Sequence, residues 1–258
     1  MILHFSVDDF IDAFLDLKEH TYKSVFEQET FSQMRCFHQM FGFTFSCYCF
    51  YESQNGNLSE IPACYAEEFQ ENASWLRFGF HGRSAQSNYC STLFSFGELI
   101  DNPTTAAEHY NMVIEQLVRI TGGGACIDRF PRIHYYAGSF EICRAWKKGA
   151  YGIQGLISAE DNRMCYYHNE AQWAELINGD YCFDRKLNIG FWRTSLRLED
   201  IKDERCLKEK LSQLEDKKKC LIFTHEPCLK EKRIKQYMLI CGEVATEKSC
   251  GVGYFYEI

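Results

Sequence analysis

The chain has 258 residues, of which 46% are hydrophobic and 16% aromatic, enough for one sizeable core and too few for two ordinary large domains. Its 36 acidic residues outnumber 28 basic ones, and the net charge of −8 argues against nucleic acid as a partner. No stretch approaches the length of a membrane span, and two aspartates occupy the place of a signal peptide's apolar region. We therefore expect a cytoplasmic protein without membrane contact.

The chain contains 14 cysteines, a number that in a short secreted protein would indicate a disulfide framework. Here they are scattered through hydrophobic runs, and no CxxC pair occurs. We interpret them as reduced and mostly buried. The spacing also argues against a structural zinc knuckle.

Short β-rich runs alternate with longer helical stretches along the chain, which is typical of repeated β-α units around a parallel sheet. Seven runs are predicted to be strands: 2–7, 41–51, 75–80, 130–138, 152–158, 191–198 and 220–224.

Three helices are indicated most clearly. One begins near Asp9, a second begins at the Asn102–Pro103 cap and ends at 122–124, and a third carries the apolar stripe at 207–214. Seven strands with intervening helices predict a single domain, 1–258, folded as a distorted (β/α)7 barrel. An open doubly wound sheet would give a similar pattern.

Polar residues follow several of these predicted strands. The carboxyl ends of parallel strands meet at one rim, where barrel enzymes place their catalytic groups. A simpler reading is that each histidine is a hydrogen-bonded rim residue and that the aspartates cap the first helix. The residues in question are Asp8, Asp9, His81, His134, Glu160, Asp161 and His225.

Four segments, taken in order, resemble motifs of the polysaccharide deacetylase (NodB-like) family of metal-dependent carbohydrate esterases, whose members fold as distorted (β/α)7 barrels. They are HFSVDDF, LRFGFHGRS, PRIHYYAG and IFTHEP, and they fall within residues 1–227. The family's remaining motif, an aspartate followed by tryptophan, is poorly matched by SAEDN, which leaves Asp161 as a weak candidate.

The resemblance implies a role for each matching residue. Asp8 would be the catalytic base, and Arg132 would hold it in place. Asp9 and His81 would bind the metal, and His225 would protonate the leaving group.

The second metal-binding histidine of the family is replaced here by Ala85. Catalytic zinc sites usually have three protein ligands, so the expected site is short by one. We predict that His134, from the neighbouring strand, is the third ligand. The alternative is that His134 packs against Tyr135 or Tyr136.

Hydrolysis of an amide or ester can be catalysed by a divalent metal together with a carboxylate base and a proton donor. We expect zinc, with cobalt, manganese or nickel as alternatives. Adjacent residues of a strand face opposite ways, so Asp8 and Asp9 can reach one site only if the strand breaks after Val7.

The predicted function is metal-dependent deacetylation of a small carbohydrate, or a related hydrolysis of an acylated small molecule. Four aromatic residues could offer faces to a sugar ring: Trp146, Trp192, Tyr135 and Tyr136. Two alternatives remain. One is a catalytically silent barrel that binds a carbohydrate or protein, and the other is a metal-independent C–N hydrolase that uses Asp8, His81 and His225. The oligomeric state stays open.

Overall fold

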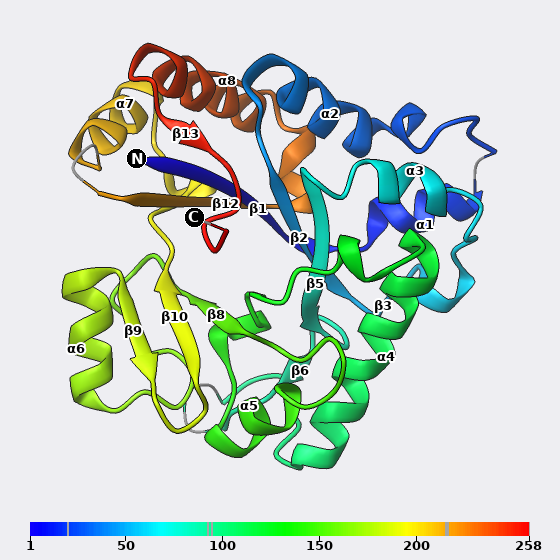
Figure 1. Ribbon diagram of the computed structural model, residues 1–258, viewed down its shortest axis with the longest axis vertical. Helices are drawn as coiled ribbons and strands as arrows, with labels where there is room; N and C mark the ends of the chain where they lie inside the picture. The colour runs from blue at the N-terminus through cyan, green and yellow to red at the C-terminus, as the bar shows by residue number, and fades with distance from the viewer. Residues whose placement is uncertain (20, 92, 94, 215–216, 258) are drawn as a thin grey trace.

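The central feature of the fold is a twisted, mainly parallel sheet whose strands run side by side with helices outside them (Figure 1). The computed structural model describes residues 1–19, 21–91, 93, 95–214 and 217–257. The sheet has the order β11-β12-β1-β2-β5, and β13 pairs with the start of β1. Its strands are β1 (Ile2–Phe10), β2 (Phe45–Phe50), β5 (Leu76–Gly82), β11 (Leu196–Arg197), β12 (Lys219–His225) and β13 (Gly251–Val252).

A second sheet continues the curve of the first. It has the order β8-β10-β9, in which β8 (Gly155–Ser158) and β10 (Ile189–Arg193) are parallel and β9 (Tyr181–Asp184) is antiparallel. Two short pairs lie outside the ring: β3 (Glu52–Ser53) with β4 (Gly56–Asn57), and β6 (Ser87–Asn88) with β7 (Glu98–Leu99).

Backbone hydrogen bonds link the two sheets into a closed ring of seven segments, which we call staves: β1, β2, β5, 127–132, β8, β10 with β11, and β12. This ring is the distorted (β/α)7 barrel that the strand pattern predicted. The fourth stave, 127–132, contacts β5 on one side and β8 on the other. The sixth stave is β10 followed by β11. The linking bonds are Asp128 N to Phe78 O, Gln154 N to Arg129 O, Thr194 N to Ser158 O and Ser195 N to Leu221 O, at 2.8–3.0 Å.

The prediction that 130–138 forms a regular strand is wrong. Within the described residues, a single isolated bridge, Phe78 to Ile127, joins the fourth stave to β5, and a 3-10 turn occupies His134–Tyr136. Pro131 has no N–H to donate to a ladder, and Tyr135 and Tyr136 have φ values of 56° and 55°. The stave therefore ends in a tight turn at the rim of the barrel.

Eight α-helices cover the outside of the barrel in the part of the chain that the structure describes. They are α1 (Asp12–Glu19), α2 (Glu29–Phe41), α3 (Ala66–Glu71), α4 (Pro103–Thr121), α5 (Phe140–Trp146), α6 (Glu170–Gly179), α7 (Glu204–Gln213) and α8 (Lys232–Glu247). The predicted caps of α4 are present: Asn102 accepts from Thr104 N and Thr105 N, and Gly122 ends the helix at φ 79°. Among the described residues, no helix is long and apolar enough to span a membrane. None of the 14 cysteines, all of which lie in the described part of the chain, forms a disulfide bond, and most are buried.

Side chains of the central strands alternate between two environments, as the two-residue period of a strand requires. In β1, Leu3, Phe5 and Val7 belong to the large core between the barrel and the helices. His4 contacts the rings of the C-terminal segment, while Ser6 and Asp8 bind Arg132. His4, Ser6 and Asp8 therefore face the inside of the barrel, with Asp8 nearest its carboxyl end.

The C-terminal segment fills the barrel at the end opposite Asp8. Gly253 N donates to Leu3 O at 3.1 Å, beside the pairing of β13 with the first residues of β1. Phe255 is fully buried in a small inner cluster of aromatic and aliphatic side chains. The other fully or largely buried members of this cluster are Tyr48, Ile157 and Leu221. One end of the barrel is thus packed, and the carboxyl ends of the strands form the other.

Candidate active site

The break that Asp8 and Asp9 require is present in β1. Asp9 has a φ of 56°, and the pairing of β1 with β2 shifts register between Val7 and Phe10. Asp8 keeps the regular pairing with β12, where His225 lies opposite it. Asp8 consequently points into the barrel, and Asp9 turns toward β5.

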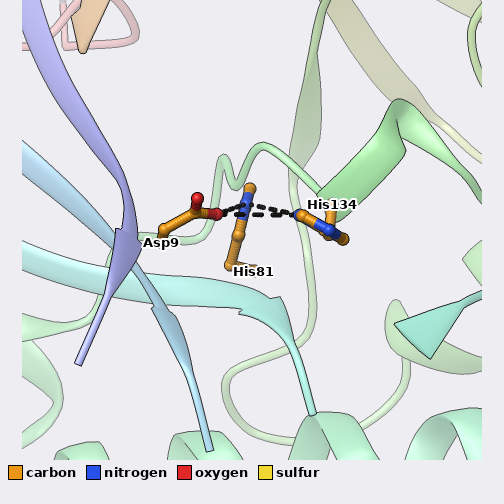
Figure 2. A group of neighbouring side chains, drawn as sticks. All are labelled: Asp9, His81 and His134. Atoms are coloured by element: carbon orange, nitrogen blue, oxygen red, sulfur yellow. Dashed lines mark hydrogen bonds and ion pairs between the residues drawn. The ribbon is translucent and has the colours of Figure 1, made fainter. Parts of the chain in front are cut away.

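Three side chains from distant parts of the chain converge beside this break (Figure 2). Asp9 Oδ1 lies 3.2 Å from His81 Nε2 and 3.7 Å from His134 Nδ1. The two histidine nitrogens are 3.2 Å apart. His81 is the second-to-last residue of β5, and His134 is the first residue of the turn that follows 127–132. The structure thus brings together the three residues that the sequence analysis proposed as ligands.

The hydrogen bonds of His81 define which of its nitrogens faces Asp9. Its Nδ1 lies 2.6 Å from the carbonyl oxygen of Arg132, which can only accept, so Nδ1 carries the proton. The lone pair of a neutral His81 is then on Nε2, directed at Asp9 and His134. Asp9 Oδ1 is buried and accepts no hydrogen bond within the described residues. These electron-pair donors face one another, an arrangement that calls for a cation or proton between them.

The charge states of the cluster suit a cation. Burial, and next His81, lower the pKa of His134 to about 3, so His134 is neutral at pH 7. Burial alone would raise the pKa of Asp9, but the neighbouring His81 outweighs it and the pKa falls to about 2. The cluster therefore offers one carboxylate and two imidazoles. This is the donor type that zinc prefers in catalytic sites.

The spacing of the three atoms also fits a metal. A tetrahedral zinc with bonds of about 2.0–2.1 Å keeps its ligand atoms about 3.3–3.4 Å apart. The three observed separations are 3.2, 3.2 and 3.7 Å. Only a small adjustment of rotamers separates this arrangement from the ideal one, so Asp9, His81 and His134 fit a divalent metal.

Asp8 lies in a fully buried network with Arg132. The guanidinium donates to Asp8 Oδ1 at 2.7 Å and to Ser6 Oγ at 3.0 Å through Nη1. Its Nη2 donates to Thr194 Oγ1 at 3.0 Å. The arginine–aspartate pair expected from the third motif is therefore observed, and it holds the Asp8 carboxylate in one orientation.

His225 is held by a residue that the sequence analysis did not select, Glu199. Glu199 Oε1 accepts from His225 N at 2.7 Å, from Thr224 Oγ1 at 2.7 Å, and lies 3.1 Å from His225 Nδ1. Burial alone would lower the pKa of His225, but the bond to Glu199 and the charges of Asp8 and Asp9 outweigh it and raise the pKa. His225 is thereby favoured in its protonated form.

These groups surround one cavity of about 260 Å³. Its wall includes Asp8, His81, His134 and His225, together with the aromatic rings of Tyr135 and Phe223. Asp9 opens on its other side to a second, more polar hollow beside Phe50 and Gln86. The ligand cluster therefore lies between two open spaces at the carboxyl end of the barrel.

Two of the four aromatic residues proposed to face a sugar do not do so. Trp146 is fully buried, and its Nε1 donates to Ala106 O at 2.9 Å. Trp192 packs against Phe130 and Phe255, at the closed end of the barrel. Both predictions are wrong because an aromatic ring in a β-α unit most often packs in a core. Tyr135 and Tyr136 do line the cavity.

The weak candidate Asp161 is engaged elsewhere. Its side chain is about half exposed and forms a bidentate ion pair with Arg163, with N–O distances of 2.6–2.9 Å. Two other acids contact motif residues: Glu160 accepts from the Tyr136 hydroxyl at 3.0 Å, and Glu199, in the segment RLED that follows β10, contacts His225. A sequence signal for it exists, because Glu199 follows a predicted strand in the same way as the other rim residues.

No family model and no curated protein matches this chain. Among solved structures, a polysaccharide deacetylase from Bacillus cereus is 11% identical, with 99% of this chain and 93% of that chain covered and a TM-score of 0.47. A family 4 carbohydrate esterase from Streptomyces lividans, in complex with acetate, is 8% identical over 98% and 92%, with a TM-score of 0.49.

A third structure is a family 4 acetyl xylan esterase from Clostridium thermocellum, in complex with a cobalt ion. It is 10% identical, with 86% of this chain and 88% of that chain covered and a TM-score of 0.42. Because these likenesses are weak in sequence and in superposition, the chemistry proposed for this chain rests on its own side chains.

Proposed function

We propose that this protein is a metal-dependent hydrolase that removes an acetyl or related acyl group from a carbohydrate derivative. The observation that carries the proposal is the convergence of Asp9, His81 and His134 beside two further groups, the Asp8–Arg132 pair and the His225–Glu199 pair. An open cavity joins these groups. Hydrolysis of an amide or ester needs what they offer: a cation site, a base and an acid.

The proposed metal ligands are Asp9, His81 and His134. Zinc is the metal we expect, because two imidazoles and one carboxylate are typical ligands of catalytic zinc, and because three protein ligands leave a position open. When bound, a divalent metal supplies Lewis acidity, which polarises an acyl carbonyl and acidifies water.

The remaining steps are assigned to residues of the chain. Asp8 accepts a proton from the attacking water, and Arg132 holds that carboxylate in one orientation through a contact of 2.7 Å. His225 donates a proton to the nitrogen or oxygen of the leaving sugar. Glu199 supports this donation because it favours the protonated imidazole.

The size of the cavity favours a small substrate. Its volume of about 260 Å³ lies just below the range of roughly 300–1,000 Å³ that is typical of ligand pockets. Tyr135 and Tyr136 line it and offer apolar ring faces of the kind that pack against sugars. We therefore propose a mono- or short oligosaccharide derivative as the substrate.

The proposal is tested by elemental analysis of protein purified without added metal, combined with acetate release from acetylated sugars before and after chelation. We expect about one equivalent of metal, and we expect activity to be lost on chelation and restored by added zinc. Metal-free protein without turnover would favour the silent binding barrel. Turnover that survives chelation would favour the metal-independent hydrolase.

The His134 assignment has its own test. His134→Ala should lower metal affinity sharply while the protein stays folded, since a rim side chain contributes little to the core. The matched control is His38→Ala, because His38 is also partly buried but stacks on Trp75 outside the site. Metal affinity in His134→Ala equal to that of the wild type would remove His134 from the ligand set.

A further inference from the structure

Arg197 is a cation in the wall of the catalytic cavity that the proposed mechanism leaves unused. It lies on β11, opposite Phe223 of β12, and both residues line the same cavity as Asp8 and His225. Its guanidinium carbon is 5.8 Å from the centre of the Phe223 ring. About one third of its side chain is exposed, so the group is reachable from the cavity but largely removed from bulk water.

Arg197 donates no hydrogen bond within the described part of the chain, and its buried Nε has no partner. Its two nearest carboxylate oxygens are Glu199 Oε2 at 3.7 Å and Asp200 Oδ1 at 3.8 Å, both beyond hydrogen-bond length. A buried N–H without an acceptor costs free energy. The Arg197 guanidinium can therefore donate hydrogen bonds to an acceptor group that enters the cavity.

The nearby acids form ion pairs with Arg197 but accept no hydrogen bond from it, and Glu199 Oε2 is itself buried without a hydrogen-bond partner within the described residues. Glu199 is committed through its other oxygen to His225, whose protonated form it stabilises. Asp200 is more than half exposed, so water screens its charge. Glu199 thus directs its hydrogen bonds to His225 and none to Arg197, so the guanidinium keeps its donors for another acceptor.

The other two arginines of the cavity, Arg132 and Arg163, already donate to acceptors, although the buried Nε of Arg132, like that of Arg197, has no partner within the described residues. Arg132 has Asp8, Ser6 and Thr194 as acceptors. Arg163 has both oxygens of Asp161. Among the described residues, Arg197 is therefore the cavity arginine whose guanidinium donates no hydrogen bond.

We infer that Arg197 binds an anionic group, a phosphate or a carboxylate, carried by the sugar part of the substrate. This inference rests on the proposed function. Arg197 and His225 share Glu199, so Arg197 lies on the side of the cavity from which the leaving group is protonated. The acidic group therefore belongs to the leaving sugar and not to the acyl group. A planar guanidinium suits both phosphate and carboxylate because it can offer two parallel N–H donors.

The test compares three N-acetylated sugars with metal-loaded protein: N-acetylglucosamine, its 6-phosphate, and N-acetylmuramic acid, which carries a carboxylate. Wild-type kcat/KM should be at least tenfold higher for one of the acidic sugars, and the preferred one identifies the anion. Arg197→Gln should lower that value on the order of 10- to 100-fold and leave the neutral sugar within about twofold. Arg197→Lys should restore part of the loss.

Arg205→Gln is the matched control, because Arg205 is an exposed arginine of α7 paired with Glu209. It should change none of the three rates. An equal loss for all three sugars in Arg197→Gln, with a shifted pH profile, would show that Arg197 acts only through Glu199 and His225, and would overturn the inference. Wild-type preference for the neutral sugar would also overturn it.

Binding separates this inference from the proposed function. If no sugar releases acetate, the proposed function fails, and calorimetry with inorganic phosphate then tests Arg197 alone. We expect wild-type protein to bind phosphate at least tenfold more tightly than Arg197→Gln. Equal binding by the two proteins would overturn the inference regardless of activity.

Discussion

Asp8 and Asp9 are neighbours in the chain but occupy different environments. Asp8 is 2% exposed and bound by Arg132, whereas Asp9 faces His81 and His134. A regular strand would send the two side chains to opposite faces. The left-handed φ of 56° at Asp9 brings both carboxylates to the same end of the barrel instead. The strained backbone at Asp9 thus allows Asp8 to serve as the proposed base and Asp9 as a proposed metal ligand.

The two aspartates should respond differently to removal of charge. Asp8→Asn should keep its metal but lose turnover by about 10²–10⁴-fold, because it removes the proposed base. Asp9→Asn should lose the metal. Metal content and acetate release measure the two effects, and the exposed Asp101→Asn serves as the control. Equal metal loss in both variants would contradict the division of roles.

Glu199 should set the alkaline limit of activity. It raises the pKa of His225, so the imidazole stays protonated to higher pH than a free histidine. As pH rises through that pKa, the proton donor and the rate are lost. Glu199→Gln removes the charge, and the falling limb of kcat/KM should move to lower pH by about 1–3 pH units. An unmoved limb in the pH–rate profile would show that His225 is not the acid.

At the scale of elements, the helix after β1 is capped from a distance. Glu226, just beyond β12, accepts from Ile11 N at 2.7 Å, Asp12 N at 2.9 Å and Ala13 N at 2.5 Å. These are the free N–H groups at the start of α1. Asp8 and Asp9 are therefore not its caps, and the simpler reading of that pair is wrong.

Glu226→Ala should destabilise the protein, because it leaves three backbone donors without an acceptor in a buried position. We expect a loss of about 2–4 kcal/mol in the free energy of unfolding, measured with urea. Glu231→Ala, at an exposed position in the same segment, should change it by less than about 0.5 kcal/mol. A loss for Glu226→Ala no larger than that of the control would mean that water replaces the carboxylate.

At the scale of the whole molecule, the C-terminal segment closes one end of the barrel. Phe255 is fully buried among Ile157, Leu221 and Tyr48, which come from three different strands. A seven-stave ring cannot fill its own interior at this end, and the last residues of the chain supply the missing volume.

Phe255→Ala should therefore cost about 3–5 kcal/mol in the free energy of unfolding, as expected for loss of a large ring from a packed interior. Chemical denaturation measures this cost. Phe183→Ala, at a position that is 41% exposed, provides the comparison and should cost much less. A cost below about 1 kcal/mol for Phe255→Ala would show that the segment covers the barrel without stabilising it.

The sequence by itself determined the order of the β-α units and most of the rim residues. Strand runs and their polar ends are local features, so Asp8, Asp9, His81 and His225 could be placed from hydrophobic patterning and short motifs. His134 was found for the same reason, although its turn was predicted as strand, because left-handed tyrosines after it carry no clear local signal.

Only the tertiary structure decided which distant groups meet. Glu199, Arg197 and the closed end of the barrel depend on contacts between separate staves, and Glu226 caps a helix more than 200 residues earlier in the chain. Whether a polar side chain finds a hydrogen-bond partner depends on which residues surround it in the folded protein. Periodicity along the chain reports the face of a side chain but not its partner, so these features had to be read from the folded molecule.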